Sequence, residues 1–296
     1  MNRMKTLLAY GFAILWFALA EANSPAQELS KLPYVPTPQI VVDEMLKMAN
    51  VTAKDFVVDL GSGDGRMILT AAKTFKANGL GVDIDSKLVD LSNKAAKSQG
   101  LDDRAKFIEQ DMFKADISKA TVVTLYVLPD FMEKLRPKLL KELKPGTRIV
   151  AHDYYMSGWY PDRQATLTVP EKVDANGTDK AYLYLWIVPS MVSGHWCMDL
   201  DLGTGKPPPI VLSLNQEHQM LAGAAETVLS SLDVESPTLK GDEIDFFLTI
   251  NTTKYRFSGK VQNDNLQGSA VSATSPKPIP WRANKLPPDN RKCFSR

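Results

Sequence analysis

The sequence predicts an α/β protein, with a doubly wound, mostly parallel sheet followed by a small antiparallel β domain. Between residues 34 and 189, short apolar segments alternate with helical segments, which is the pattern of a parallel sheet with crossover helices. A glycine-rich turn follows the first apolar segment, as in folds that bind nucleotides. After residue 189 the helical pattern fades, and short alternating segments typical of antiparallel strands take over.

The first region is expected to open with a helix at Thr37-Pro38, because threonine can cap a helix and proline is tolerated at its first position. Apolar runs predict strands, and 3.6-residue periodicity predicts the helices between them. The expected strands are 56–60, 80–83, 107–109, 122–128 and 148–152, and the later helices are 67–75, 86–99 and 131–143.

The second region, residues 190–284, is predicted to be an antiparallel β domain, either a barrel or a sandwich. The turn-forming sequence Asn263-Asp264-Asn265 predicts a hairpin between two of its strands. Residues 285–296 are polar and are expected to form a flexible tail. The expected strands are 194–200, 210–214, 243–250, 254–261 and 266–271.

The N-terminus has the features of a signal peptide over residues 1–22, followed by a linker over residues 23–33. Arg3 and Lys5 precede an apolar run that is short for a membrane span, and Ala20-Glu21-Ala22 has the small-x-small form of a cleavage site. Cleavage after Ala22 is preferred to cleavage after Ala26, and an uncleaved anchor is the alternative. The chain is therefore expected to be exported, to the periplasm or the outer face of the inner membrane.

Composition and charge fit a globular protein and disfavour nucleic acid as a partner. The chain is 44% hydrophobic and 23% charged, with a net charge of +1 that falls to zero without Arg3, Lys5 and Glu21. Cys197 and Cys293 could pair after export, but Cys197 fits better as a packed residue in an apolar strand. Two cysteines and three scattered histidines predict no metal site.

The segment from Val57 to Arg66 carries the functional signal. Glycines at 61, 63 and 65 let the backbone turn sharply and approach a ligand. Asp83 ends the next expected strand, where a carboxylate could hold two ribose hydroxyls of a nucleoside cofactor. A dinucleotide fingerprint would place the third glycine where Arg66 stands, so the spacing disfavours a nicotinamide-dependent oxidoreductase.

This D-x-G-x-G-x-G pattern resembles motif I of the class I, Rossmann-like S-adenosylmethionine (SAM) methyltransferases, and the resemblance extends over about residues 34–189. It implies that SAM is the cofactor and that segments 165–169 and 181–188 close the sheet as an antiparallel pair. Asp64 and Arg66 are expected to be surface residues. The implied cofactor residues are Asp59, Gly61, Gly63 and Gly65 at the methionine part, Asp83 at the ribose, Ile84 on an adenine face and Asp111 near the adenine amino group.

The acceptor side is expected at the ends of the fourth and fifth strands, where the resemblance places Tyr126 and Pro129, and His152 and Asp153. A lysine acceptor is protonated at neutral pH, because its ordinary pKa is about 10.4, so the site must favour the free amine. A carboxylate or an aromatic wall could hold the ammonium group, or His152 could act as a general base.

A closer resemblance involves Tyr34-Val35-Pro36-Thr37-Pro38 together with the glycine motif. Both resemble the lysine-specific protein methyltransferases that act on mitochondrial inner-membrane proteins, and their bacterial relatives. This implies methyl transfer to nitrogen, for example of a protein lysine, with Tyr34 and Thr37 near the cofactor or that lysine. A small-molecule acceptor and a membrane-proximal substrate stay open, as does the oligomeric state. An exported, non-catalytic scaffold on this fold is the alternative, because SAM is not known to be supplied outside the cytoplasm.

Overall fold

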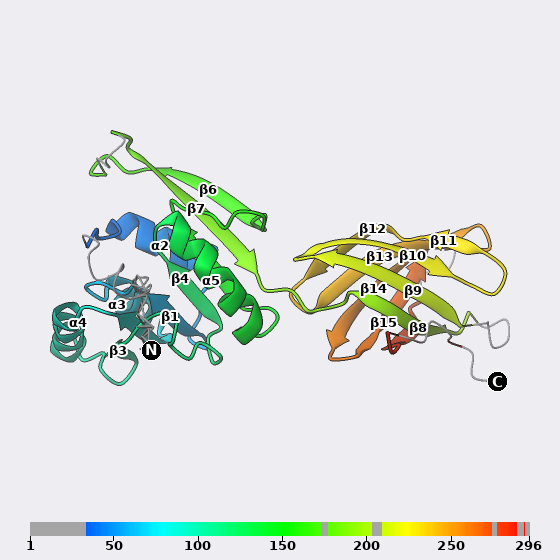
Figure 1. The fold of residues 1–296 in the computed structure, drawn as a ribbon, viewed down its shortest axis with the longest axis horizontal. Coiled ribbons are helices and arrows are strands. Elements are labelled where there is room, and N and C mark those ends of the chain that lie inside the picture. Colours follow the sequence, from blue (N-terminus) through cyan, green and yellow to red (C-terminus); the bar gives the residue numbers. More distant parts are fainter. Residues whose placement is uncertain (1–33, 173–176, 203–208, 274–276, 289–292, 294–296) are drawn as a thin grey trace, which may run out of the picture. The chain divides into compact units, whose positions relative to one another are not determined.

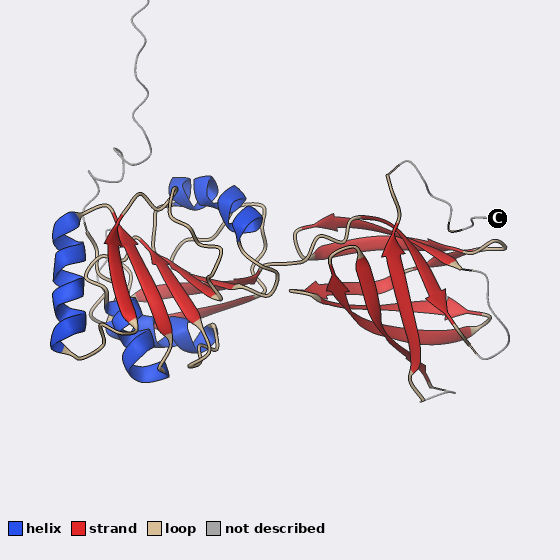
Figure 2. Ribbon diagram, turned by 90° about the horizontal axis from the view of Figure 1, so that it is seen from below, coloured by secondary structure: helices blue, strands red, loops and turns tan. Residues whose placement is uncertain are grey.

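The computed structural model describes residues 34–172, 177–202, 209–273, 277–288 and 293. The predicted signal peptide and linker lie outside these residues. The described chain forms a seven-stranded sheet from residues 56–187 and a nine-stranded sheet from residues 194–285 (Figure 1). Helices accompany only the first of these sheets, and the second region consists of strands and loops (Figure 2).

The seven-stranded sheet has the order β3-β2-β1-β4-β5-β7-β6. β1 to β5 are parallel, whereas β7 runs antiparallel to both of its neighbours, which confirms the doubly wound sheet and its closing pair. Strand order reverses between β1 and β4, so ligands are expected at the carboxyl ends of these strands. The strands are β1 Phe56–Leu60, β2 Asn78–Asp83, β3 Ala105–Glu109, β4 Val122–Leu125, β5 Arg148–His152, β6 Arg163–Thr168 and β7 Lys180–Ile187.

Helices cover both faces of this sheet (Figures 1 and 2). Side chains of α2, α3 and α4 pack in one core with Val57, Val122 and Val150 of the central strands, and α5 lies on the other face. The next residue of β1, Val58, is also fully buried, as expected for a strand covered on both sides. None of the described helices is both long and apolar enough to span a membrane. The helices are α2 Gln39–Met48, α3 Arg66–Phe75, α4 Ser86–Ser98 and α5 Pro129–Glu142.

Two predicted helix starts were wrong, and both differences shape the site. α2 begins at Gln39 with Pro38 as its N-cap, because the amides of residues 41 and 42 bond to the Pro38 carbonyl. Thr37 is therefore not the cap, and its hydroxyl is available to the site. α5 begins at Pro129, whose missing N–H costs nothing at a first helical position. β4 ends at Leu125, which leaves residues 126–128 as a connecting loop.

The nine-stranded sheet is antiparallel throughout, in the order β11-β10-β9-β8-β16-β15-β14-β13-β12. It curls until β10 lies against β12, which nearly closes it around one apolar core. The predicted hairpin turn is present at Asn263, with φ of 55°. The strands are β8 Gly194–Leu200, β9 Ile210–Glu217, β10 Met220–Glu226, β11 Ser231–Asp233, β12 Glu235–Lys240, β13 Glu243–Ile250, β14 Thr253–Gln262, β15 Asn265–Ser272 and β16 Ile279–Lys285.

β10, β11, β12 and β16 were not predicted from the sequence. β10 reads MLAGAAE, a composition that favours helices, and β16 contains Pro280. Their strand conformation comes from pairing with neighbours that are distant in sequence, such as β8 with β16. β16 also extends to Lys285, one residue into the expected tail.

Cys197 on β8 forms a disulfide with Cys293, with Cα atoms 5.2 Å apart. The expectation that Cys197 is an unpaired packed residue was therefore wrong. The bond attaches residue 293 of the expected tail to the sheet, across a sequence separation of 96 residues. The sequence could not decide this pairing, because it depends on where the last strand leaves the chain.

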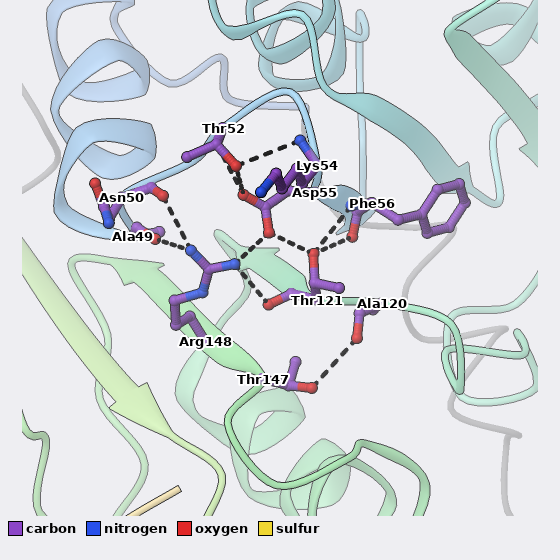
Figure 3. Close-up of polar contacts among 10 residues, drawn as sticks. All are labelled: Ala49, Asn50, Thr52, Lys54, Asp55, Phe56, Ala120, Thr121, Thr147 and Arg148. Atoms are coloured by element: carbon purple, nitrogen blue, oxygen red, sulfur yellow. Dashed lines mark hydrogen bonds and ion pairs between the residues drawn. The ribbon is translucent and has the colours of Figure 1, made fainter.

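A buried carboxylate fastens the amino ends of β1, β4 and β5 (Figure 3). Asp55 is 6% exposed and forms an ion pair with Arg148, the first residue of β5. The Arg148 guanidinium also donates to the Ala49 carbonyl at 2.7 Å, after the end of α2. The Thr121 hydroxyl and the Thr52 amide donate to the two Asp55 oxygens, each at 2.7 Å. Four chain segments thus share one carboxylate.

We expect Asp55→Ala to lower the free energy of unfolding by about 3 kcal/mol, because it leaves Arg148 and its neighbours without their buried partner. Burial raises the Asp55 pKa, but the bonds from Thr121 and Thr52 and the charge of Arg148 outweigh it, so the pKa lies below 3.8. The stabilisation is thus present at neutral pH and is lost as the pH falls through the lowered pKa of Asp55. Urea denaturation would measure it.

The matched control is Asp103→Ala, which removes an exposed carboxylate whose ion pair with Arg104 is 3.8 Å long. This change should cost about 0.5 kcal/mol or less. Equal losses in the two variants would contradict the structural role of Asp55.

Candidate active site

The turn between β1 and α3 depends on glycine at three positions. Gly61, Gly63 and Gly65 have φ of 86°, 52° and 80°, in the left-handed region that side chains disfavour. A Cβ on Gly65 would come within 2.7 Å of the Phe107 ring. The amides of Gly61 and Ser62 both donate to the Val82 carbonyl, at 2.8 and 3.0 Å, which fixes the turn beside the end of β2. The three predicted glycines therefore shape one backbone cradle.

Asp83 at the end of β2 is bonded to this cradle. The Gly63 amide donates to Asp83 Oδ2 at 2.7 Å, and the Asp85 amide donates to Oδ1 at 2.9 Å. The side chain is half-buried, and each oxygen keeps a second lone pair. A carboxylate oriented in this way can accept hydrogen bonds from two neighbouring ribose hydroxyls.

Asp59, next to the end of β1, is buried at 7% exposure and accepts a hydrogen bond of 2.6 Å from the Thr124 hydroxyl of β4. Burial raises the pKa of Asp59 from 3.8 to about 7, the Thr124 bond opposes this, and the charges of Asp83 and Asp64 add to it. Close to neutral pH this carboxyl can therefore change charge. A cation bound beside it would favour the ionised form.

Ile84 and Asp111 follow the ends of β2 and β3, on the same edge of the sheet. Ile84 is half-buried directly after Asp83. Asp111 keeps its side chain 12% exposed, and its Oδ1 accepts from the Phe113 amide at 2.9 Å. Their positions agree with the adenine side of the predicted site, although no contact ties them to the glycine cradle.

The segment from Tyr34 to Pro38 lies over the glycine cradle. A Cβ on Gly63 would overlap the Tyr34 ring, and the Tyr34 hydroxyl is hydrogen-bonded to Asp64. Burial and the Asp64 charge raise the Tyr34 pKa to about 12, although Arg66 lowers it, so the phenol stays neutral. Arg66 holds Asp64 through bonds of 2.6 to 3.1 Å and donates to the Thr37 carbonyl at 2.8 Å.

Asp64 and Arg66, expected to be surface residues, are instead the clamp for this N-terminal segment, with side chains 25% and 32% exposed. Their spacing in sequence looks like that of any solvated pair. Only the approach of Thr37 from 29 residues away reveals their role.

On the acceptor side, His152 is the buried centre. It is 1% exposed, and its ring stacks on Tyr126 with centroids 4.1 Å apart. The ring of Tyr154 stacks on Tyr126 from 6.2 Å. Thr37 Oγ1 lies 3.5 Å from His152 Nδ1, which links the N-terminal segment to this aromatic group.

His152 is neutral at neutral pH. Burial lowers its pKa from 6.5 to about 4, Asp153 opposes this shift, and the ammonium of Lys172 adds to it. Its Nε2 forms no hydrogen bond within the described part of the chain and lies 3.4 Å from Asp153 Oδ2. An uncharged, unsatisfied imidazole nitrogen can accept a proton or a hydrogen bond from a substrate.

Asp153 follows β5 directly and has φ of 61°, which is unusual for a residue other than glycine. The Tyr182 amide donates to its Oδ1 at 3.0 Å. Its Oδ2 receives the Lys172 ammonium at 2.7 Å, and that ammonium also donates to the Lys180 carbonyl at 2.5 Å. Lys172 was not predicted, because it lies in a loop between β6 and β7 that has no sequence pattern.

Of the predicted acceptor residues, the structure brings Tyr126, His152, Asp153 and Thr37 together. Pro129 is exposed as the first residue of α5, and its evident part is to start that helix. Within the described residues, no group of three or more histidine, cysteine or acidic side chains could hold a metal ion.

Comparisons with known proteins agree with this geometry. The family model of the ANTKMT methyltransferase domain matches residues 59–163. A protein-lysine N-methyltransferase of Saccharolobus islandicus is 43% identical over 155 residues, which are 52% of this chain and 93% of that protein. An ATP synthase lysine N-methyltransferase of Xenopus laevis is 34% identical over 140 residues, which are 47% of this chain and 61% of that protein.

Among solved structures, an RNA methyltransferase from Salinibacter ruber in complex with S-adenosylhomocysteine is 46% identical to this chain. The match covers 53% of this chain and 96% of that one, with a TM-score of 0.48. All three matches cover about half of this chain, so they leave the rest of it without a counterpart.

The residues at the carboxyl edge fit SAM. The backbone cradle leaves room for a ligand, and Asp83 is oriented for a ribose. Ser62 Oγ is buried without a hydrogen-bond partner among the described residues, so it is free to bond a ligand. The raised pKa of Asp59 suits a cationic ligand, and SAM carries a sulfonium and an ammonium group.

We expect the affinity for SAM to rise as the pH increases from about 5 to 7 and then to level off, because a bound cation favours ionised Asp59. Asp59→Asn should remove most of this pH dependence. Isothermal titration calorimetry would measure it. Asp83→Ala should weaken binding roughly a hundredfold through lost ribose bonds. The same pH dependence in the Asn variant would show that another group titrates.

Proposed function

Because the chain belongs to the class I SAM-dependent methyltransferase family that includes the protein-lysine N-methyltransferases, we propose that its methyl acceptor is the side-chain amine of a protein lysine. The chain is an enzyme that uses SAM as methyl donor. It spans nearly the whole Saccharolobus relative but less than two thirds of the Xenopus one, so the acceptor is a proposal for this chain.

One observation carries the proposal: a neutral, buried His152 stacks on Tyr126 beside the Asp153 carboxylate. A carboxylate attracts the acceptor ammonium, and aromatic faces favour a cation within about 6 Å. The neutral imidazole adds no repulsive positive charge. These side chains can therefore bring a lysine to the edge of the sheet where β1 and β5 end.

Bound SAM would supply a methyl group activated by its sulfonium. The glycine cradle, Asp59 and Asp83 would hold and orient it, and the Tyr34–Pro38 segment would exclude water. Asp153 would position the lysine, and His152 Nε2 would accept a hydrogen bond from its nitrogen. Nothing in this arrangement requires a charged residue to enter the path of the amine.

The test is transfer of labelled methyl from SAM to extracts of producing cells that lack the gene, followed by acid hydrolysis and amino-acid analysis. We expect label in methyllysine. Asp83→Ala should abolish it through loss of the cofactor, and Asp153→Asn should reduce it roughly tenfold or more by weakening lysine binding. Asp85→Ala is the matched control, since its exposed carboxylate only caps α4. Label in RNA, lipid or small molecules instead would overturn the lysine proposal.

We also propose that the protein is exported to an oxidising compartment, to the periplasm or the outer face of the inner membrane. The basic and apolar N-terminal sequence and the Cys197–Cys293 disulfide support this. Proteins of reducing compartments rarely keep such bonds. How SAM would reach the enzyme there is a consequence that this proposal raises.

We expect protein isolated from producing cells to lack residues 1–22 and to resist thiol labelling until it is reduced. Intact mass spectrometry with and without reductant measures both properties. A retained N-terminus together with two free thiols would contradict export. Cys197→Ser is the control, because it should leave Cys293 reactive without reductant.

A further inference from the structure

The ammonium of Lys172 is buried on the acceptor side of the site. Its side chain is 8% exposed, which is rare for lysine, because desolvating an ammonium costs several kcal/mol unless it is paired. The Lys172 nitrogen is paired with Asp153 Oδ2 at 2.7 Å and with the Lys180 carbonyl at 2.5 Å. The protein has therefore built a binding site for a lysine ammonium here.

The backbone holds Asp153 in place for this contact. Its φ of 61° is a strained conformation for a side-chain-bearing residue, and such strain concentrates at functional sites. The Asp153 amide donates to the Tyr182 carbonyl at 2.7 Å, and the Tyr182 amide returns a bond of 3.0 Å to Oδ1. One carboxylate oxygen is anchored to β7, so the other is directed at the ammonium.

The neighbours of this ammonium are the residues proposed to receive the acceptor. The Asp153 oxygen that binds Lys172 also lies 3.4 Å from His152 Nε2. The His152 ring stacks on Tyr126 and approaches Thr37 of the segment that lies over the glycine cradle. The carboxyl ends of β1, β4 and β5 meet at this one edge of the sheet. An internal lysine thus occupies the position that an external lysine would need.

We propose that Lys172 is itself a methyl acceptor, so that the enzyme carries a methylation site in its own β6–β7 connection. This inference rests on the proposed lysine specificity. The Lys172 ammonium first releases one proton to solvent. Its free amine then forms a nitrogen–carbon bond with the methyl group of SAM as the carbon–sulfur bond breaks. The products are a methylammonium on Lys172 and neutral S-adenosylhomocysteine. While Lys172 occupies the subsite, an external lysine must displace it.

A purely structural ion pair is the competing explanation for the buried contact, and the two differ in one measurable way. A structural lysine is never modified, whereas an acceptor gains a methyl group that comes from SAM. Lys172→Arg keeps the positive charge beside Asp153 and cannot yield methyllysine. It therefore removes the acceptor without removing the pair.

The experiment incubates purified protein with SAM that carries a deuterated methyl group. Peptides from a protease that does not cut at lysine are then analysed by mass spectrometry. Poly-L-lysine serves as an external acceptor in a parallel reaction. We expect label at Lys172 in the wild type, roughly a hundredfold above that at exposed Lys141, because the bound amine has a high effective concentration. Label at Lys172 should be absent from Asp83→Ala, and Lys141→Arg should be labelled at Lys172 like the wild type.

The rate of this labelling should not change when the protein is diluted, because the reaction occurs within one molecule. A rate proportional to protein concentration would overturn the inference that Lys172 reacts in its own site. Methylated poly-L-lysine with unlabelled Lys172 would overturn the inference and leave the proposed function standing. If neither is labelled by protein that binds SAM, the proposed function fails, and this inference fails with it.

Discussion

The hydrogen bond from the Gly63 amide to the Asp83 carboxylate is the contact on which the cofactor site depends. It joins the turn after β1 to the end of β2, at a distance of 2.7 Å. The amide can point this way only because Gly63 adopts a positive φ and has no Cβ, whose place is filled by the Tyr34 ring. The same carboxylate that orders the protein backbone is thereby oriented for a ribose, so folding and cofactor recognition use one group.

The N-terminal segment connects the two halves of the site. Arg66 holds the Thr37 carbonyl, while the Thr37 hydroxyl lies beside His152. The wrong expectation that Thr37 caps α2 and the wrong expectation that Arg66 is a surface residue have the same explanation. Both side chains are used by contacts between segments that are distant in sequence. Through this segment, order in the cofactor cradle and order around the acceptor side chains are coupled.

The two edges of the parallel sheet treat charge differently. At the amino edge, Asp55 and Arg148 satisfy each other and their neighbours, so the carboxylate is stabilised in its ionised form. At the carboxyl edge, burial raises the pKa of Asp59 and lowers that of His152, and the Ser62 hydroxyl has no partner among the described residues. Groups left in unfavourable protonation states are typical of functional sites, because a ligand supplies the missing interactions. One edge contributes stability, and the other is prepared for chemistry.

The sequence by itself determined the parallel sheet, the glycine turn and the acidic end of β2. These features follow from local periodicity, from the backbone freedom of glycine and from the fixed geometry of a strand–turn–helix unit. The tertiary structure alone decided the disulfide, the strands β10 and β16, the Asp64–Arg66 clamp and the burial of Lys172 beside Asp153. Each of these depends on which distant segments meet. Residue type and spacing carry no information about such meetings, since the free energy that selects them comes from pairing and burial in the folded chain.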